Sequence, residues 1–311
     1  MNYARTFLPF LLIGAVLGCG GGGGGTGGGT GGGTGGGTGG APGSVILFNA
    51  GRDGNFEVYL MGANGLNPAN LTNNLANDGD AEWNPAGTKV VFDSDRDGNF
   101  EIYVMNADGS SVVRLTSNLA LDAEPSWSPD GTKIVFESDR DSTTGIRDLY
   151  VMDSNGLNVT RLTTTTTGTG AKHPEWSPDG TKILFQADQG SGVFLFTVLA
   201  DGTGQVQLST TADVDTDAAW SPDGTKIVFA STRDGGPKQI YTMNADGTGP
   251  LRITNDASND FQPNWSPDGT TILFTTDRDG NSEVYKMAAD GSGQTNVSNS
   301  TGADTQAQYN P

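Results

Sequence analysis

Polar side chains recur at two fixed positions ahead of a repeated aromatic residue. Three residues before the aromatic stand Asp80, Glu124, His173, Asp217, Gln262 and Gln306, and five residues before it stand Asp78, Asp122, Ala171, Asp215, Asp260 and Asp304. Residues two apart on a strand share a side, so we expect both sets to face one common space. Carboxylates crowded there would repel one another unless a cation or water screens them. The pattern predicts a site for a metal ion or a basic segment of a partner; the alternative is that these side chains only cap turns where strands begin.

A second acidic pattern resembles a calcium-binding loop. Asp93, Asp95 and Asp97 supply oxygen at alternate positions, and Gly98 allows a sharp bend. A helical calcium loop would end in glutamate, where this chain has Val104. The same residues also suit a hairpin turn with a local arginine–aspartate pair. Calcium is the one cofactor that the sequence suggests, and we otherwise expect none.

Catalytic patterns are scarce. The chain has no Gly-x-Ser-x-Gly nucleophile motif, and its single histidine excludes a multi-histidine metal site. We therefore expect a non-enzymatic protein. The alternative is a carbohydrate-active enzyme, a lyase or glycosidase, in which paired acids such as Glu124 and Glu175 act as acid and base.

These residues belong to a repeat that fills the chain after Pro42. Trp-Ser-Pro-Asp-Gly starts at Trp127, Trp176, Trp220 and Trp265, with variant copies at Trp83 and Tyr309. The period is about 45 residues, which marks propellers and solenoids. Within a unit, Ser-Pro-Asp-Gly favours a type I turn, and short β-rich runs such as Thr132 to Phe136 alternate with tight turns. Each unit thus predicts one four-stranded blade, and each tryptophan is expected to be buried between blades.

The two ends of the repeat region predict a closed ring. Val45 to Phe48 matches the second strand of a unit but lacks the strand that should precede it. The missing strand stands at the other end, at Gln306 to Tyr309. We therefore expect an all-β, six-bladed propeller over residues 44–311, closed by the C-terminal strand joining the N-terminal blade.

The repeated Trp-Ser-Pro-Asp-Gly-Thr-Lys-Ile-Val-Phe, followed by Ser-x-Arg-Asp-Gly and Ile-Tyr, resembles the TolB-like (WD-repeat-like) β-propeller family. The resemblance covers about residues 45–311, without the α/β domain that precedes the propeller in TolB. It implies a monomeric scaffold that binds a protein partner in the cell envelope.

The N-terminal residues predict export and a tether. Residues 1–18 have a positive start and a short apolar stretch, as a signal peptide does. Leu-Gly-Cys then resembles the lipobox of bacterial lipoproteins, which implies that Cys19 carries lipid. Residues 19–43 are rich in glycine and threonine and predict a flexible tether. A formal charge of −19 argues against nucleic acid and against anionic membrane surfaces. We thus expect an extracytoplasmic protein that meets the membrane only through the lipid.

Overall fold

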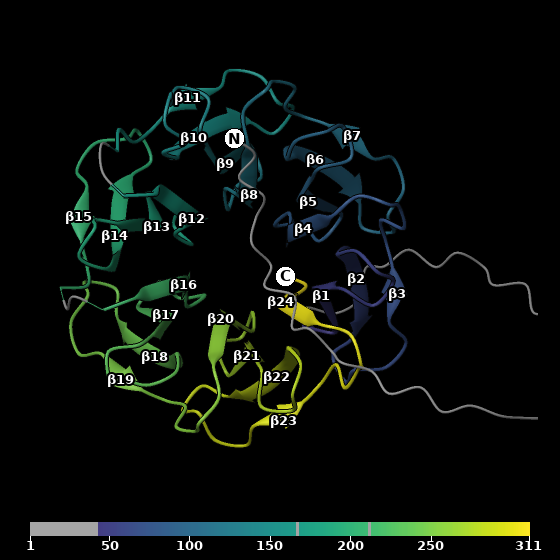
Figure 1. Cartoon of the computed structure of the whole chain (residues 1–311), viewed down its shortest axis with the longest axis vertical. Coiled ribbons are helices and arrows are strands. Elements are labelled where there is room, and N and C mark those ends of the chain that lie inside the picture. Colours follow the sequence, from purple (N-terminus) through teal and green to yellow (C-terminus); the bar gives the residue numbers. More distant parts are fainter. Residues whose placement is uncertain (1–42, 166–167, 211–212) are drawn as a thin grey trace, which may run out of the picture. The chain divides into compact units, whose positions relative to one another are not determined.

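A computed structural model describes residues 43–165, 168–210 and 213–311 of the chain. Within these residues the chain forms strands and turns and no helix, so none of them provides a helix that could cross a membrane. The proposed signal peptide, Cys19 and nearly all of the proposed tether lie outside the described residues. The strands form six antiparallel, four-stranded sheets arranged as blades around a common centre (Figure 1). The prediction of a six-bladed all-β propeller is confirmed.

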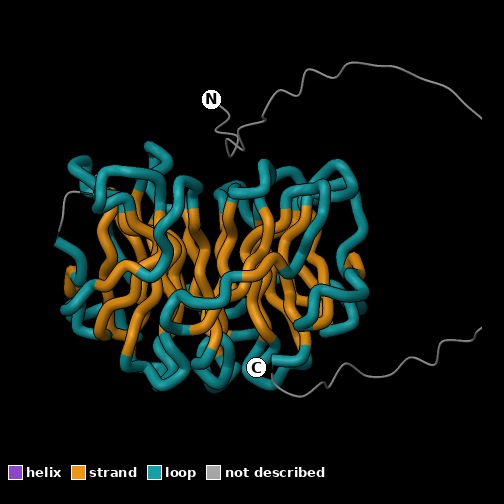
Figure 2. The backbone as a smooth tube through the Cα atoms, turned by 90° about the horizontal axis from the view of Figure 1, so that it is seen from below, coloured by secondary structure: helices purple, strands orange, loops and turns teal. Residues whose placement is uncertain are grey.

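Each blade is numbered here by its place in the ring and written from its inner to its outer strand. Blade 1 is β24 (Asp304–Tyr309), β1 (Val45–Ala50), β2 (Glu57–Gly62) and β3 (Ala69–Asn70); blade 2 is β4 (Asp78–Trp83), β5 (Lys89–Ser94), β6 (Glu101–Asn106) and β7 (Val113–Arg114). Blade 3 is β8 (Asp122–Trp127), β9 (Lys133–Ser138), β10 (Asp148–Asp153) and β11 (Thr160–Arg161); blade 4 is β12 (Gly170–Trp176), β13 (Lys182–Asp188), β14 (Val193–Leu199) and β15 (Val206–Gln207). Blade 5 is β16 (Asp215–Trp220), β17 (Lys226–Ser231), β18 (Gln239–Asn244) and β19 (Leu251–Arg252); blade 6 is β20 (Asp260–Trp265), β21 (Thr271–Thr276), β22 (Glu283–Ala288) and β23 (Thr295–Asn296). Figure 2 shows the strands running between two faces of loops.

The Ser-Pro-Asp-Gly segments form the hairpin that joins the inner strand of a blade to its second strand. In blade 3 the amide of Gly131 donates to the carbonyl of Ser128 at 2.8 Å, which closes the predicted turn. Gly131 has a φ of 69°, a conformation that glycine adopts without steric cost. The Asp130 carboxylate accepts from the Ser128 hydroxyl and from the Thr132 amide. The turn therefore fixes the register of β8 against β9.

Each tryptophan packs between neighbouring blades. Trp127 is 6% exposed and lies in one apolar cluster with Val91 and Ile102 of blade 2 and Phe136 and Tyr150 of blade 3. Equivalent clusters hold the other tryptophans. Burying a large aromatic side chain contributes several kcal/mol. The tryptophans are thus part of the core, as predicted.

The ring closes within blade 1. Strand β24 pairs antiparallel with β1, with Ile46 opposite Tyr309 and Leu47 opposite Gln308. The amide of Asn310 donates to the carbonyl of Val45 at 3.0 Å. The first and last strands of the ring therefore share one sheet, which confirms the predicted closure.

Candidate functional site

The ring of residues three positions before each aromatic has an unusual backbone. Its six members have positive φ, namely Asp80 (48°), Glu124 (54°), His173 (49°), Asp217 (54°), Gln262 (50°) and Gln306 (51°). At the same place, each inner strand shifts register against the second strand of its blade, as at a β-bulge. A bulge re-aims the side chain and interrupts the alternation of the strand. We call these six residues the channel ring.

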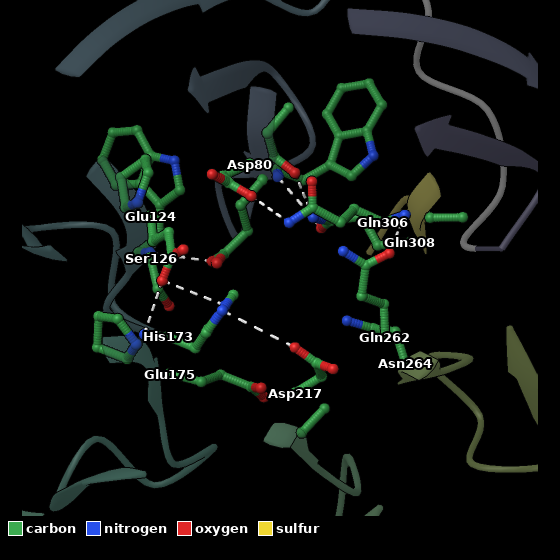
Figure 3. A pocket seen from close by; sticks show the side chains of 18 of the residues that line it. Asp80, Glu124, Ser126, His173, Glu175, Asp217, Gln262, Asn264, Gln306 and Gln308 are labelled. Carbon is green, nitrogen blue, oxygen red and sulfur yellow. Dashed lines mark hydrogen bonds and ion pairs between the residues drawn. The ribbon is translucent and has the colours of Figure 1, made fainter. Parts of the chain in front are cut away.

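The channel ring lines a central cavity of about 330 Å³. Its side chains converge from all six inner strands (Figure 3). Towards the other end of the inner strands, the cavity wall continues with a second tier, the residues directly before each aromatic: Glu82, Ser126, Glu175, Ala219, Asn264 and Gln308. The site is therefore a polar channel built by all six copies of the repeat.

Charge is unevenly distributed around the channel ring. Blades 2, 3 and 5 contribute the carboxylates of Asp80, Glu124 and Asp217, whereas blades 6 and 1 contribute the amides of Gln262 and Gln306. The Nε2 of Gln306 donates to Asp80 and so connects the two sides. The channel thus has one acidic side and one neutral, hydrogen-bonding side.

The acidic side also holds two basic groups. In blade 4, the Nδ1 of His173 lies 3.2 Å from Glu124 Oε2, and its Nε2 lies 3.8 Å from Asp217 Oδ1. The Nζ of Lys238 lies 3.7 Å from Asp217 Oδ2 and donates to the Thr216 hydroxyl at 2.9 Å. Sequence reasoning missed Lys238 because it belongs to the loop between β17 and β18, outside both acidic sets. Three carboxylates against one lysine and one histidine still leave the ring acidic.

Two glutamates of the second tier have altered acidity. Glu82 accepts the amide proton of Trp127 at 2.9 Å, and Glu175 accepts that of Trp220 at 3.1 Å, in each case from the next blade. Burial raises the pKa of Glu82 to about 7. Burial, together with the charge of Glu82, raises the pKa of Glu175 well above its ordinary value. Such carboxyls can hold a proton near neutral pH, and that is the property of a general acid.

The five aspartates at the beginning of the inner strands do not line this cavity, which corrects the expectation that they share the channel mouth. The side chains of Asp78, Asp122, Asp215, Asp260 and Asp304 are buried, and each is paired with an arginine of its own blade at 2.6–3.1 Å. The bulge at the channel ring is the physical reason, because it interrupts the two-residue alternation on which the prediction rested. Ala171, the sixth member of that set, is buried among apolar residues.

Each of these arginines is also sandwiched against aromatic rings. Arg140 pairs with Asp122 at 2.8 Å, and its guanidinium carbon lies 5.1 Å from the Phe136 ring centre and 4.8 Å from that of Tyr150. The same arrangement occurs at Arg52, Arg96, Arg233 and Arg278. We call this set of aspartate, arginine, phenylalanine and tyrosine the arginine lock. It fastens the inner strand to the loop between the second and third strands.

The calcium prediction at Asp93, Asp95 and Asp97 is wrong, because the three carboxylates are engaged separately. Asp93 accepts the amide proton of Glu124 at 3.0 Å, Asp95 accepts that of Asn77 at 2.8 Å, and Asp97 accepts from the hydroxyl of Tyr103 at 2.5 Å. Among the described residues, no group of three or more His, Cys, Asp or Glu side chains is placed to hold a metal ion. The aspartates fix the hairpin, which was the alternative interpretation.

These features define a six-bladed β-propeller with a polar, partly acidic central channel. The sequence matches the TolB beta propeller domain over residues 39–112, 96–190, 168–250 and 219–311, and the chain belongs to this family. Comparison with curated proteins gives no match.

Solved structures show the same fold. TolB from Acinetobacter baumannii superposes with a TM-score of 0.76 at 20% identity, covering 86% of this chain and 67% of that one. A putative TolB from Agrobacterium tumefaciens gives 0.68 at 19% identity, over 86% and 98% of the two chains. An oligogalacturonate lyase in complex with manganese gives 0.59 at 18% identity, over 81% and 73%. The same architecture therefore occurs in proteins of different function, and the fold alone does not assign one.

Proposed function

We propose that this protein is a non-catalytic, TolB-like scaffold that binds a protein partner through the acidic mouth of its channel. The main support is the channel ring, where Asp80, Glu124 and Asp217 from three blades face one cavity. Complementary charge raises association rates and selects partners. A basic segment of a partner would meet carboxylates held on a rigid frame, at little cost in ordering the binding surface.

The test uses the full chain as bait in extracts of the cell envelope. The variant Asp80→Asn/Glu124→Gln/Asp217→Asn removes the acidic side of the ring. A matched control, Asp108→Asn/Asp201→Asn/Asp246→Asn, removes the same charge from exposed turns. We expect wild type and control to retain the same partner, and the ring variant and raised salt to release it. Equal retention by the ring variant would refute the proposal.

We also propose that the propeller faces an extracytoplasmic compartment and is anchored by lipid on Cys19. The support is the sequence of residues 1–19 and the family to which the chain belongs. Labelling with a radioactive fatty acid should mark wild type and leave Cys19→Ala unlabelled. Label retained in Cys19→Ala would exclude this anchor.

A carbohydrate-active enzyme remains the alternative function, and one observation favours it. Glu175 lines the cavity, and its raised pKa suits a proton donor. The test is turnover of a panel of uronic-acid and neutral oligosaccharides. Turnover by wild type that is lost in Glu175→Gln would establish the enzyme, whereas no turnover by wild type would exclude it for that panel.

A further inference from the structure

Two leucines stand fully exposed at the tips of equivalent loops. Leu75 lies three residues before β4 and Leu119 three residues before β8, and both side chains are 100% exposed. Their loops enter the inner strands at the end where the channel ring lies. A single exposed leucine is ordinary on a protein surface. Two at the same loop position of adjacent blades form a repeated feature of this face.

The loop that carries Leu75 is held by hydrogen bonds on both sides of the leucine. The Asn74 amide donates to Glu57 Oε1 at 2.9 Å, and the Ala76 amide donates to Asn74 Oδ1 at 2.7 Å. The Nδ2 of Asn55 donates to the carbonyls of both residues. The leucine is therefore presented on a fixed backbone.

The loop of Leu119 repeats this arrangement residue for residue. The Asn118 amide donates to Glu101 Oε1 at 2.8 Å, the Ala120 amide to Asn118 Oδ1 at 2.7 Å, and Asn99 Nδ2 to the Asn118 carbonyl at 3.2 Å. A preordered contact loses little conformational entropy on binding. Both leucines thus stand on ordered backbones, so a contact with them would cost little backbone entropy.

The loop geometry does not depend on leucine. The equivalent tip of the loop before β20 is Ala257, and that of the loop before β24 is Thr301. There the Ser258 amide donates to Asp256 Oδ1 at 2.8 Å, and the Ser300 amide donates to Glu283 Oε1 at 3.0 Å. The equivalent loops of blades 4 and 5 contain residues outside the described part. Since the loop forms with alanine or threonine, folding gives no reason for two leucines.

Charge identifies the kind of occupant. The blades that carry Leu75 and Leu119 also contribute Asp80 and Glu124 to the channel ring. A partner that contacts both features needs apolar side chains next to cationic ones. A net charge of −19 disfavours an anionic membrane and a second copy of this chain.

We propose that Leu75 and Leu119 form a two-point apolar contact for a basic amphipathic segment of a partner protein. This inference rests on the proposed function and adds the apolar half of the recognition. Burial of one exposed leucine changes affinity by about tenfold.

The probe is a fluorescein-labelled synthetic peptide of alternating leucine and lysine pairs, and binding to the full chain is read by anisotropy. The variant Leu75→Thr/Leu119→Thr introduces the side chain found at position 301. The control, Leu157→Thr/Leu251→Thr, removes two leucines that are 61% and 63% exposed elsewhere. We expect the first variant to weaken binding by at least tenfold and the control to leave it unchanged. A peptide with serine in place of leucine should bind wild type and variant alike.

Several results would overturn the proposal. Equal binding by the leucine variant would do so, as would no peptide binding up to about 1 mM. Leucine-dependent binding to phosphatidylglycerol vesicles would assign the face to membrane, and leucine-dependent dimers in sedimentation would assign it to self-association. Peptide binding that depends on Asp80 and Glu124 but not on the leucines would refute this inference alone and leave the proposed function standing.

Discussion

Blade 4 differs from the other five blades at the arginine lock. Each of the others pairs an aspartate of its inner strand with an arginine after its second strand, whereas blade 4 has Ala171 and Gln189 at these positions. Phe196 replaces the tyrosine and stacks on Phe185 with ring centres 5.5 Å apart. At the position of the lock, blade 4 therefore has apolar packing in place of an ion pair. It also contributes His173, the one histidine of the chain, to the channel ring.

The difference between blade 4 and the others distinguishes residues that stabilise the blades from residues that form the candidate site. The locked aspartates are buried and serve the frame of the blade, although their regular placement looks like a binding site in the sequence. The channel ring has the same backbone in all six blades but carries four types of side chain, namely Asp, Glu, His and Gln. Variation on a constant backbone, rather than regularity, is what marks the candidate site.

The largest expected change in the free energy of unfolding comes from removing the arginine of one arginine lock. Arg140→Gln gives blade 3 the residue found at position 189 and leaves the buried carboxylate of Asp122 without its cation. Removing one partner of a buried ion pair costs about 3–5 kcal/mol. We expect chemical denaturation to show a loss of this size in the free energy of unfolding.

The double variant Arg140→Gln/Asp122→Ala makes blade 3 resemble blade 4 and should recover at least half of that loss. The matched control is Gln189→Ala in blade 4, which should change stability by less than about 0.5 kcal/mol. If the double variant were as unstable as the two single changes added together, the lock would not act as a pair.

Introducing the aspartate alone into blade 4 should lower the free energy of unfolding by a smaller amount, and adding the arginine should restore it. Ala171→Asp buries a carboxylate in blade 4 with no arginine beside it, and we expect a loss of roughly 2–3 kcal/mol, measured by urea denaturation. Adding Gln189→Arg should restore most of the stability, because Phe185 and Phe196 already offer rings on which a guanidinium can lie. No recovery in the double variant would show that blade 4 has lost more than the lock residues.

A smaller effect should appear in the second tier, where blades 2 and 4 both carry glutamate. The pKa of Glu82 is about 7 in the folded chain against an ordinary value of 4.5. The unfolded chain therefore releases this proton first as pH rises, so ionisation of Glu82 lowers stability progressively from about pH 4.5 to 7.

Glu82→Gln keeps an oxygen for the Trp127 amide and removes that penalty. We expect this substitution to leave the free energy of unfolding almost unchanged at pH 4 and to raise it by about 1–2 kcal/mol at pH 8. The measurement is thermal melting of both proteins at each pH. Asn264→Ala, a change in the same tier without a titrating group, should show no such dependence on pH. The same stability gain at pH 4 and pH 8 would contradict the assignment.

Much of the fold can be predicted from the sequence because residues adjacent in the chain determine its turns and short strands. Ser-Pro-Asp-Gly specifies a turn wherever it stands, and the short runs between turns are long enough for strands only. The unpaired Val45 to Phe48 segment and the spare Gln306 to Tyr309 segment fit only each other. Ring closure could be predicted from these facts without any long-range contact.

The site could be predicted only in part, since side-chain direction depends on the bulge. The channel ring was placed in the channel, whereas Asp78 and its equivalents were placed there wrongly. One signal in the sequence could have revealed the lock. In a single repeat, Ala171 replaces the aspartate and Gln189 replaces the arginine, so the two positions change together. Glu82 was missed because only two of six copies carry glutamate there, and Lys238 because its loop differs from the others.

The left-handed backbone of the channel ring has a consequence for how far this propeller is from its stability optimum. Such a conformation costs a non-glycine residue about 1 kcal/mol or more, and glycine would adopt it freely. Six residues bear that strain at once, and all six keep long or polar side chains. Glycine at these positions would relieve the strain, but it would also remove the side chains that line the cavity and the hydrogen bond from Gln306 to Asp80.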